Sequence, residues 1–400
     1  MKNILSTLLV LSFISPASVA QLPFKNDSLY KTIFAKDFCK LVQQNPQVVL
    51  LDVRSPGEYS DTSHYASLNL GHLKGAVNIE IDSIQKNTEV MEQYRDKTLV
   101  LYCSHSQRSR RVSKLLTEKG FTNFYNLNGG MSSINQLTEK EFPCKESYVE
   151  SNLSYKNLSV SDAADLIANE KNLLVLDVRP AMQFENKDTV EENNTGRIKG
   201  ALNIPYDQLK EKTAELKQKY YKKPVLIYAA SGDGDAARAA ADLSALGFKK
   251  VYHLLGGIQG FIASRKNLSA IENPPPYNLL DAIHTLDLLK SSPLLVIYDT
   301  RTKAEFENKD EKAWRNLGNI KNAVNIPEPD FGRILLPPDK NRPLLIYGHD
   351  EAHRLAKMLA SRGYNDINVL EGFYDFVWSG FNVESCRETK DFVVNHEGLY

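Results

Sequence analysis

Hydrophobic residues occur along the chain in short uninterrupted runs that alternate with amphipathic segments. Three such runs, at 48–54, 173–179 and 294–301, are rich in Val, Ile and Leu, and each ends in an Asp followed closely by an Arg. Uninterrupted apolar runs of this length are typical of strands that are covered on both faces. The pattern therefore predicts parallel sheets with helices on each side.

The same ordered set of features recurs three times. Asp52, Asp177 and Asp299 stand at nearly constant spacing within it. The set comprises a helical pattern (34–42, 163–169, 280–290), the first apolar strand, a Gly-x-Ile/Leu-Lys-x-Ala-x-Asn-Ile segment (71–79, 196–204, 318–326), a second strand (98–103, 224–229, 343–348) and a Gly-aromatic pair leading to a short last strand (120–127, 247–255, 363–370). Repetition of a whole strand–helix unit predicts three tandem doubly wound α/β domains.

Polar and proline-rich segments at 143–158 and 273–277 separate the copies. We assign residues 1–20 to a signal peptide and predict domains at 21–148, 149–272 and 273–400. The short basic start, the apolar run from Ile4 to Ile14 and the sequence Ala17-Ser18-Val19-Ala20 are typical of a secretory signal cleaved after Ala20. A retained anchor is the alternative, but the run is short for a bilayer span. We therefore expect a periplasmic or secreted protein, with no membrane attachment after cleavage.

Charge excludes some partners. The chain has 49 Lys and Arg residues and 49 Asp and Glu residues. Without a basic excess, neither nucleic acid nor an anionic membrane is expected as a main partner.

Cysteine is sparse, at four residues: Cys39, Cys103, Cys144 and Cys386. A secreted fold held by disulfides would contain more of them, so each domain must depend on its hydrophobic core. In an oxidising compartment Cys39, on the first helix, and Cys144, just after the first domain, are placed to bridge helix to linker. We state that bridge as a hypothesis, with Cys386 then left free or intermolecular.

Three motifs of the first copy resemble the rhodanese family. They are Asp52-Val53-Arg54-Ser55-Pro56-Gly57-Glu58-Tyr59, the segment 71–79, and a strand ending in Leu101-Tyr102-Cys103. The resemblance extends over nearly all of residues 30–385 in three copies. It implies a sulfurtransferase, in which a cysteine takes a sulfane sulfur from a donor such as thiosulfate, holds it as a persulfide and passes it to cyanide or a thiol.

The residues around Cys103 favour the same chemistry independently. Cys103 ends a buried strand, and the loop that follows leads into a helix starting near Arg108. Ligands of open α/β sheets bind at the carboxyl ends of strands, and a helix N-terminus there attracts anions. The thiolate is the nucleophilic form of cysteine, and nearby positive charge favours it. We predict Cys103 as the catalytic residue and an anion-binding loop made of Ser104, His105, Ser106, Gln107, Arg108 and Ser109.

The other two copies lack the nucleophile. Ala229 and Gly348 stand where the first copy has Cys103, and neither side chain can form a covalent intermediate. Loop 230–235 has also gained acids, which would repel anions. We therefore expect domains 2 and 3 to be structural, or to dock a protein that gives or takes sulfur.

Alternative functions are a non-catalytic scaffold and a phosphatase-like or arsenate-reductase-like enzyme. Four residues separate Cys103 from Arg108, whereas cysteine phosphatases of related fold use five, and the tighter ring favours a sulfane sulfur over a phosphoryl group. No metal or organic cofactor is implied, because the histidines lack the spacing of metal ligands. Asp52, Arg54 and Glu58 recur in copies without the cysteine, so we interpret them as a structural charge network. The expected partners are a small sulfur-containing anion as donor and a thiol or cyanide as acceptor.

Overall fold

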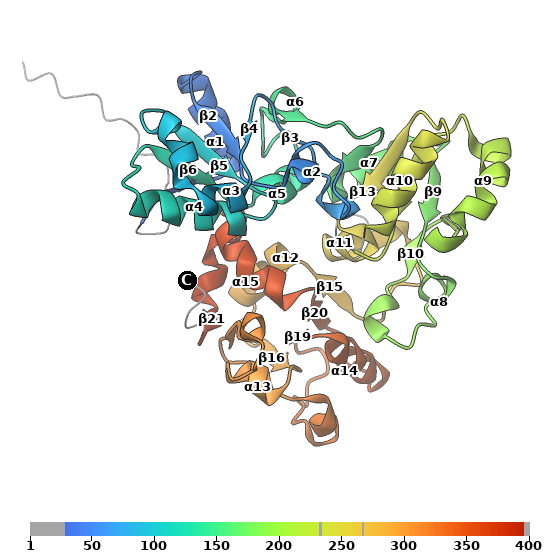
Figure 1. Cartoon of the computed structure of the whole chain (residues 1–400). Helices are drawn as coiled ribbons and strands as arrows, with labels where there is room; N and C mark the ends of the chain where they lie inside the picture. The colour runs from blue at the N-terminus through green and yellow to red at the C-terminus, as the bar shows by residue number, and fades with distance from the viewer. Residues whose placement is uncertain (1–28, 232–233, 266–267, 396–400) are drawn as a thin grey trace, which may run out of the picture.

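The computed structural model describes residues 29–231, 234–265 and 268–395. The predicted signal peptide, Gly232 and Asp233 of the acidic loop, and His396 lie outside the described residues. Figure 1 shows three α/β domains in chain order, from blue through green to red. No helix within the described ranges is long and apolar enough to cross a bilayer.

The first domain alternates strands with helices, as the apolar pattern predicts. Its elements are β1 (Lys31–Ile33), α1 (Ala35–Gln44), β2 (Val49–Asp52), α2 (Pro56–Tyr59), the 3₁₀ turn η1 (Ala66–Leu68), β3 (His72–Leu73), β4 (Val77–Asn78), α3 (Ile81–Lys86), η2 (Thr88–Tyr94), β5 (Leu99–Tyr102), α4 (Gln107–Glu118), β6 (Phe124–Leu127), α5 (Gly130–Gln136), α6 (Lys145–Tyr148) and β7 (Val149–Glu150). The parallel sheet has the order β1-β6-β5-β2-β4.

The second and third domains repeat this plan. The second contains β8 (Lys156–Leu158), α7 (Val160–Asn169), β9 (Leu174–Asp177), α8 (Ala181–Phe184), η3 (Glu191–Asn193), β10 (Arg197–Ile198), β11 (Leu202–Asn203), α9 (Tyr206–Tyr220), β12 (Val225–Tyr228), α10 (Asp235–Ala245), β13 (Val251–Leu254), α11 (Gly257–Ala263), η4 (Leu268–Ala270) and β14 (Ile271–Glu272). Its sheet order is β8-β13-β12-β9-β11. Ser159 caps α7 by accepting a hydrogen bond from the Asp162 N–H.

The third domain contains β15 (Asn278–Leu280), α12 (Ala282–Ser291), β16 (Val296–Asp299), α13 (Lys303–Phe306), η5 (Ala313–Arg315), β17 (Asn319–Ile320), β18 (Val324–Asn325), η6 (Glu328–Arg333), β19 (Leu344–Tyr347), α14 (Asp350–Ser361), β20 (Ile367–Leu370), α15 (Phe373–Asn382), η7 (Glu384–Asp391) and β21 (Val393–Val394). Its sheet order is β15-β20-β19-β16-β18. The predicted architecture of three doubly wound domains is confirmed.

A short antiparallel ribbon closes each domain. It joins β3 to β7, β10 to β14 and β17 to β21. The first ribbon places Val149 and Glu150 against the first domain, although we assigned them to the second. This boundary depends on backbone pairing between β3 and β7, which the composition of the segment does not indicate.

Side chains of β5 alternate between two cores in the first domain. Val100 and Tyr102 face a core that includes α1 and α5, whereas Leu99 and Leu101 face one that includes α3 and α4. Cys103 continues the second set and packs in the α3 and α4 core. Strand periodicity therefore directs the cysteine to the face on which α4 begins.

An Asp–Arg pair is buried at the carboxyl edge of every sheet. Arg54 donates to both carboxylate oxygens of Asp52 and, at 2.7 Å, to the Gly71 carbonyl. The same contacts recur with Asp177, Arg179 and Gly196 and with Asp299, Arg301 and Gly318. All six charged residues are at most 3% exposed. Their recurrence in every copy supports the structural interpretation of the pair.

Breaking one of these pairs should destabilise its domain strongly. Arg179→Leu leaves the Asp177 carboxylate buried without its cation, and we expect a loss of about 3–5 kcal/mol in the unfolding free energy of domain 2. Differential scanning calorimetry measures the change. Arg95→Leu removes an exposed pair with Glu92 and should cost at most about 1 kcal/mol. Equal effects from the two variants would contradict the assignment.

A disulfide joins Cys39 on α1 to Cys144, with 5.7 Å between the two Cα atoms. The hypothesised bridge is therefore present in the structure, while Cys103 and Cys386 are buried free cysteines. The bond links residues 105 positions apart and holds the segment after α5 against α1.

Replacing this bridge should weaken the first domain. We expect Cys39→Ser together with Cys144→Ser to lower its unfolding free energy by about 2–5 kcal/mol, because the crosslink restricts the unfolded chain. Calorimetry of oxidised protein gives the value. Peptide mapping without reductant should find Cys39 linked to Cys144, and recovery of both as free thiols would disprove the bond.

Candidate active site

Cys103 lies at the carboxyl end of β5, where the chain turns into α4. The residue is only 1% exposed, so its side chain is almost completely covered by its neighbours. The Cys103 carbonyl accepts a hydrogen bond from the Met131 N–H of α5, and the Ser104 carbonyl accepts one from the Ser132 N–H. These bonds fix the loop backbone between α4 and α5.

Three serines hold this loop in place through hydrogen bonds. Ser106, in the left-handed conformation with φ of 69°, precedes α4, and its hydroxyl accepts from the Gly129 N–H at 2.5 Å. Ser109 donates back to the Ser106 carbonyl at 3.1 Å, and the Ser104 hydroxyl accepts from Arg108 at 2.9 Å. All three are at most 5% exposed. The loop is thus held in one conformation before any ligand binds.

Helix geometry leaves the first amides of α4 without intrahelical acceptors. These are the N–H groups of Gln107, Arg108 and Ser109 in the first turn. Together with the helix dipole they form an anion-attracting end beside Cys103. The helix begins one residue before the predicted start.

Arg108 is held by Glu58 of α2. Its two terminal nitrogens donate to the two carboxylate oxygens at 2.5 and 2.6 Å. The hydrogen bond to Glu58 raises the pKa of Arg108 above its ordinary value, and the negative charge of Glu58 adds to this shift against the opposing effect of burial. Arg108 therefore stays positively charged while it is held by Glu58.

This contact corrects our interpretation of Glu58. Its recurrence in the third copy suggested a network with Asp52 and Arg54, but its carboxylate instead caps α2 through Ser55 and holds Arg108. Burial opposes ionisation of Glu58, yet the hydrogen bonds and charge of Arg108 outweigh it and keep the pKa of Glu58 below its ordinary value. The missed signal was that the copy with a cysteine at this strand end also has both a glutamate at position 58 and an arginine at position 108.

The remaining predicted loop residues point to different neighbours. The His105 ring lies 2.7 Å from the Ser132 hydroxyl. It is exposed on one side, but partial burial and then the charge of Arg108 lower the pKa of His105, which favours the neutral imidazole. Gln107 reaches out of the domain and donates to the Tyr374 hydroxyl of α15 at 2.7 Å.

The two arginines that follow the loop, Arg110 and Arg111, differ in position. Arg110 bonds Asn128 and, from the third domain, Asn382, whereas Arg111 is exposed. Among the described residues, no group of three or more His, Cys, Asp or Glu side chains is placed to hold a metal ion.

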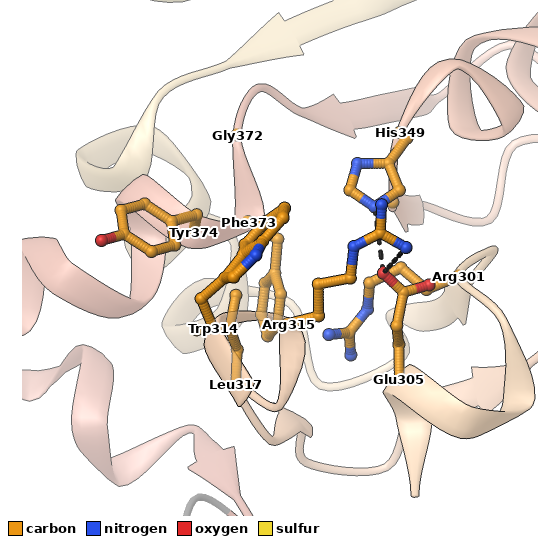
Figure 2. Close-up of a pocket in the computed structure, with 10 residues that line it drawn as sticks. Arg301, Glu305, Trp314, Arg315, Leu317, His349, Gly372, Phe373 and Tyr374 are labelled. Atoms are coloured by element: carbon orange, nitrogen blue, oxygen red, sulfur yellow. Dashed lines mark hydrogen bonds and ion pairs between the residues drawn. The ribbon is translucent and has the colours of Figure 1, made fainter. Parts of the chain in front are cut away.

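The corresponding edge of domain 3 has a different construction. A pocket of about 100 Å³ opens there beside Gly348, and Figure 2 shows Glu305 facing Arg315 and His349 within it. A Cβ atom at position 348 would lie 2.1 Å from the Thr300 hydroxyl, so that hydroxyl fills the space a cysteine side chain needs. In domain 2, Ala229 is enclosed in the core beside the alanines of α10.

A rhodanese-like domain model matches the chain three times, at residues 35–137, 159–264 and 282–378. This chain belongs to the rhodanese family. Each match covers most of one domain and begins just after the first strand of its sheet. Curated relatives include a tRNA uridine(34) hydroxylase of Cronobacter sakazakii, 29% identical over 91 residues, which are 22% of this chain and 24% of that protein.

An uncharacterized protein of Bacillus subtilis, YqhL, is 38% identical over 82 residues, which are 20% of this chain and 56% of that protein. The chain therefore matches between a quarter and about half the length of these relatives. Among solved structures, a thiosulfate sulfurtransferase from Pseudomonas aeruginosa has 16% identity and a TM-score of 0.24, with 86% of this chain and 67% of that one covered. A rhodanese-related protein from Thermoplasma volcanium has 28% identity and a TM-score of 0.21 over 26% and 89% of the two chains.

The Glu58–Arg108 pair should make the first domain sensitive to acid. Because the folded pKa of Glu58 lies below its unfolded value of about 4.3, the pair stabilises fully above that value and loses its contribution as pH falls through the folded pKa. We expect Glu58→Gln to cost about 1.5–3 kcal/mol at pH 7. The difference from wild type should shrink below about pH 4. Calorimetry from pH 3 to 7 tests this, with Glu92→Gln as an exposed control. A pH-independent difference would refute the linkage.

Proposed function

We propose that the protein is an exported sulfurtransferase that moves a sulfane sulfur from thiosulfate or a similar donor to a thiophilic acceptor through a Cys103 persulfide. One observation carries the proposal. The only copy with a cysteine at this strand end also has the braced loop and the glutamate-held arginine around it. The small-anion chemistry is thereby concentrated in domain 1.

The reaction has two balanced steps. The Cys103 thiolate attacks the outer sulfur of thiosulfate, an S–S bond forms to the cysteine, and the S–S bond of the donor breaks as sulfite leaves with the electron pair. Cyanide or a thiolate then attacks the outer persulfide sulfur and releases the Cys103 thiolate again. The first-turn amides and Arg108 stabilise the donor oxyanion and the persulfide anion.

The loop spacing favours this reaction over phosphoryl transfer. Four residues between Cys103 and Arg108 give a smaller ring than the five of cysteine phosphatases. Two hydrogen bonds lie within this segment and draw it together: Arg108 donates to the Ser104 hydroxyl, and the Ser109 hydroxyl donates to the Ser106 carbonyl. Such a ring suits one sulfur atom better than a phosphoryl group with its oxygens.

Two features support export. The first 20 residues have the pattern of a cleaved signal, and the Cys39–Cys144 disulfide is of the kind that persists in oxidising compartments. Subcellular fractionation with mass spectrometry of the mature N-terminus tests this. A cytoplasmic protein that still begins at Met1 would refute it.

A non-catalytic scaffold is the second candidate. It is favoured by the burial of Cys103 and by the engagement of Arg108 with Glu58. In that case domains 2 and 3 would dock a protein partner and the cysteine would be inert.

A turnover assay separates these functions. We expect purified protein with thiosulfate and cyanide to form thiocyanate, and Cys103→Ala to abolish this activity because no other residue replaces the nucleophile. Mass spectrometry of the thiosulfate-treated protein should find one added sulfur on Cys103. Arg108→Lys should reduce turnover by about tenfold or more, because lysine lacks the planar guanidinium that binds an anion through two hydrogen bonds.

Arg95→Lys is the matched control, since it changes an exposed bidentate pair of the same domain and should leave turnover unaltered. Thiocyanate formation that survives Cys103→Ala would eliminate the persulfide mechanism. No turnover and no sulfur on Cys103 would favour the scaffold, and phosphate release from an aryl phosphate would favour the phosphatase alternative.

A further inference from the structure

The third domain touches the Cys103 loop through α15. In Figure 1 this red helix lies directly beside α4 of the first domain. Tyr374, in its first turn, accepts the hydrogen bond from Gln107 at 2.7 Å. Asn382, its last residue, accepts one from Arg110 at 3.3 Å. Both ends of α15 thus reach the first turn of α4.

Asn382 also makes a second contact, through its backbone, with the turn that precedes α5. A Cβ atom built on Gly129 would stand 2.8 Å from the Asn382 carbonyl, so the domain 3 backbone packs directly on the turn between β6 and α5. The Gly129 N–H is the group that bonds Ser106. The end of α15 therefore packs against Gly129, whose N–H donates to Ser106 of the loop.

An aromatic contact strengthens the junction. The guanidinium of Arg110 stacks over the Phe381 ring, 5.0 Å from its centroid. A second contact of this kind joins the same two domains: Arg387 of the third domain lies over Phe34 of the first, which follows β1. Cation–π contacts of this kind stabilise the packing of domain 3 against domain 1. The hydrogen bonds from α15 to the loop are therefore made by a helix whose position is itself stabilised.

We propose that α15 of domain 3 is the outer clamp of the Cys103 site, with Tyr374 and Asn382 as positioning residues. The proposal rests on the sulfurtransferase function proposed above. The two residues touch neither the sulfur nor the donor. They act through Gln107, Arg110 and Gly129, holding the first-turn amides of α4 in the position that binds the donor anion. The silent third domain is thereby part of the active site of the first.

Loss of the clamp should have two opposite effects on Cys103: its reaction with thiol reagents should become faster, and its turnover should become slower. Removing a clamp contact lets the loop open more often, which exposes the buried thiol to reagents. The same opening disorders the amides that stabilise the transition state, which slows turnover. A variant that is merely less stable does not combine faster modification with an unchanged melting temperature.

Tyr374→Phe in the full chain is the principal test, because it removes a single hydroxyl group. We expect Cys103 alkylation by iodoacetamide, followed by peptide mass spectrometry, to become roughly fivefold faster, the factor that one neutral hydrogen bond corresponds to. Thiocyanate turnover should fall by a similar factor, mainly in kcat. Gln107→Ala should act alike, and the double variant should add little to either single one.

Tyr298→Phe is the matched control, since it removes a hydroxyl group that bonds only the Leu335 carbonyl within domain 3. It should change neither alkylation nor turnover. Asn382→Ala provides an independent second arm, with the same expected direction as Tyr374→Phe.

Failure of the clamp and failure of the function give different results. Unchanged alkylation and turnover in Tyr374→Phe and Asn382→Ala, in a wild type that forms thiocyanate, would overturn the clamp and leave the function standing. A wild type without turnover would refute the function, and the alkylation rates would still decide whether α15 restrains the loop.

Discussion

The buried Asp–Arg pair after the first long strand of each sheet is the constraint on which the rest of the structure depends. It ties the end of β2, β9 or β16 to the carbonyl of a glycine on the following segment. Because both charges are buried away from water, separating them costs several kcal/mol of free energy, on the order of 3–5 kcal/mol. The carboxyl edge of every sheet is thereby rigid, and that is where an α/β fold places its ligands.

On this common edge the three domains differ by a few side chains. In the first, Glu58 holds Arg108 next to Cys103. In the third, the equivalent Glu305 meets Arg315 and His349 instead, and the Thr300 hydroxyl fills the space of a cysteine side chain. In the second, Ala229 is buried in the same core as the alanines of α10. The two copies without a cysteine at this strand end therefore also differ from the first in the side chains around that position.

The domains are also joined into one unit. Asn157 of the second domain bonds the Asn69 carbonyl of the first, Lys357 of the third pairs with Glu191 of the second, and α15 returns from the third domain to α4 of the first. These contacts hold the three domains against one another, and in the proposed clamp they restrict the loop that follows Cys103. In the proposed enzyme, that restriction keeps a small-anion site preformed around an otherwise buried thiol.

The sequence by itself determined the number of domains, their parallel sheets and the position of Cys103 at the end of a strand, because strand periodicity, buried apolar runs and repeated motifs are local properties. It also indicated the Cys39–Cys144 bond. It did not reveal the partner of Glu58, the ribbon that carries Val149 and Glu150 to the first domain, or the reach of Gln107 to Tyr374. Those are contacts between residues tens to hundreds of positions apart, and only the packing of whole elements in three dimensions decides which distant side chains meet.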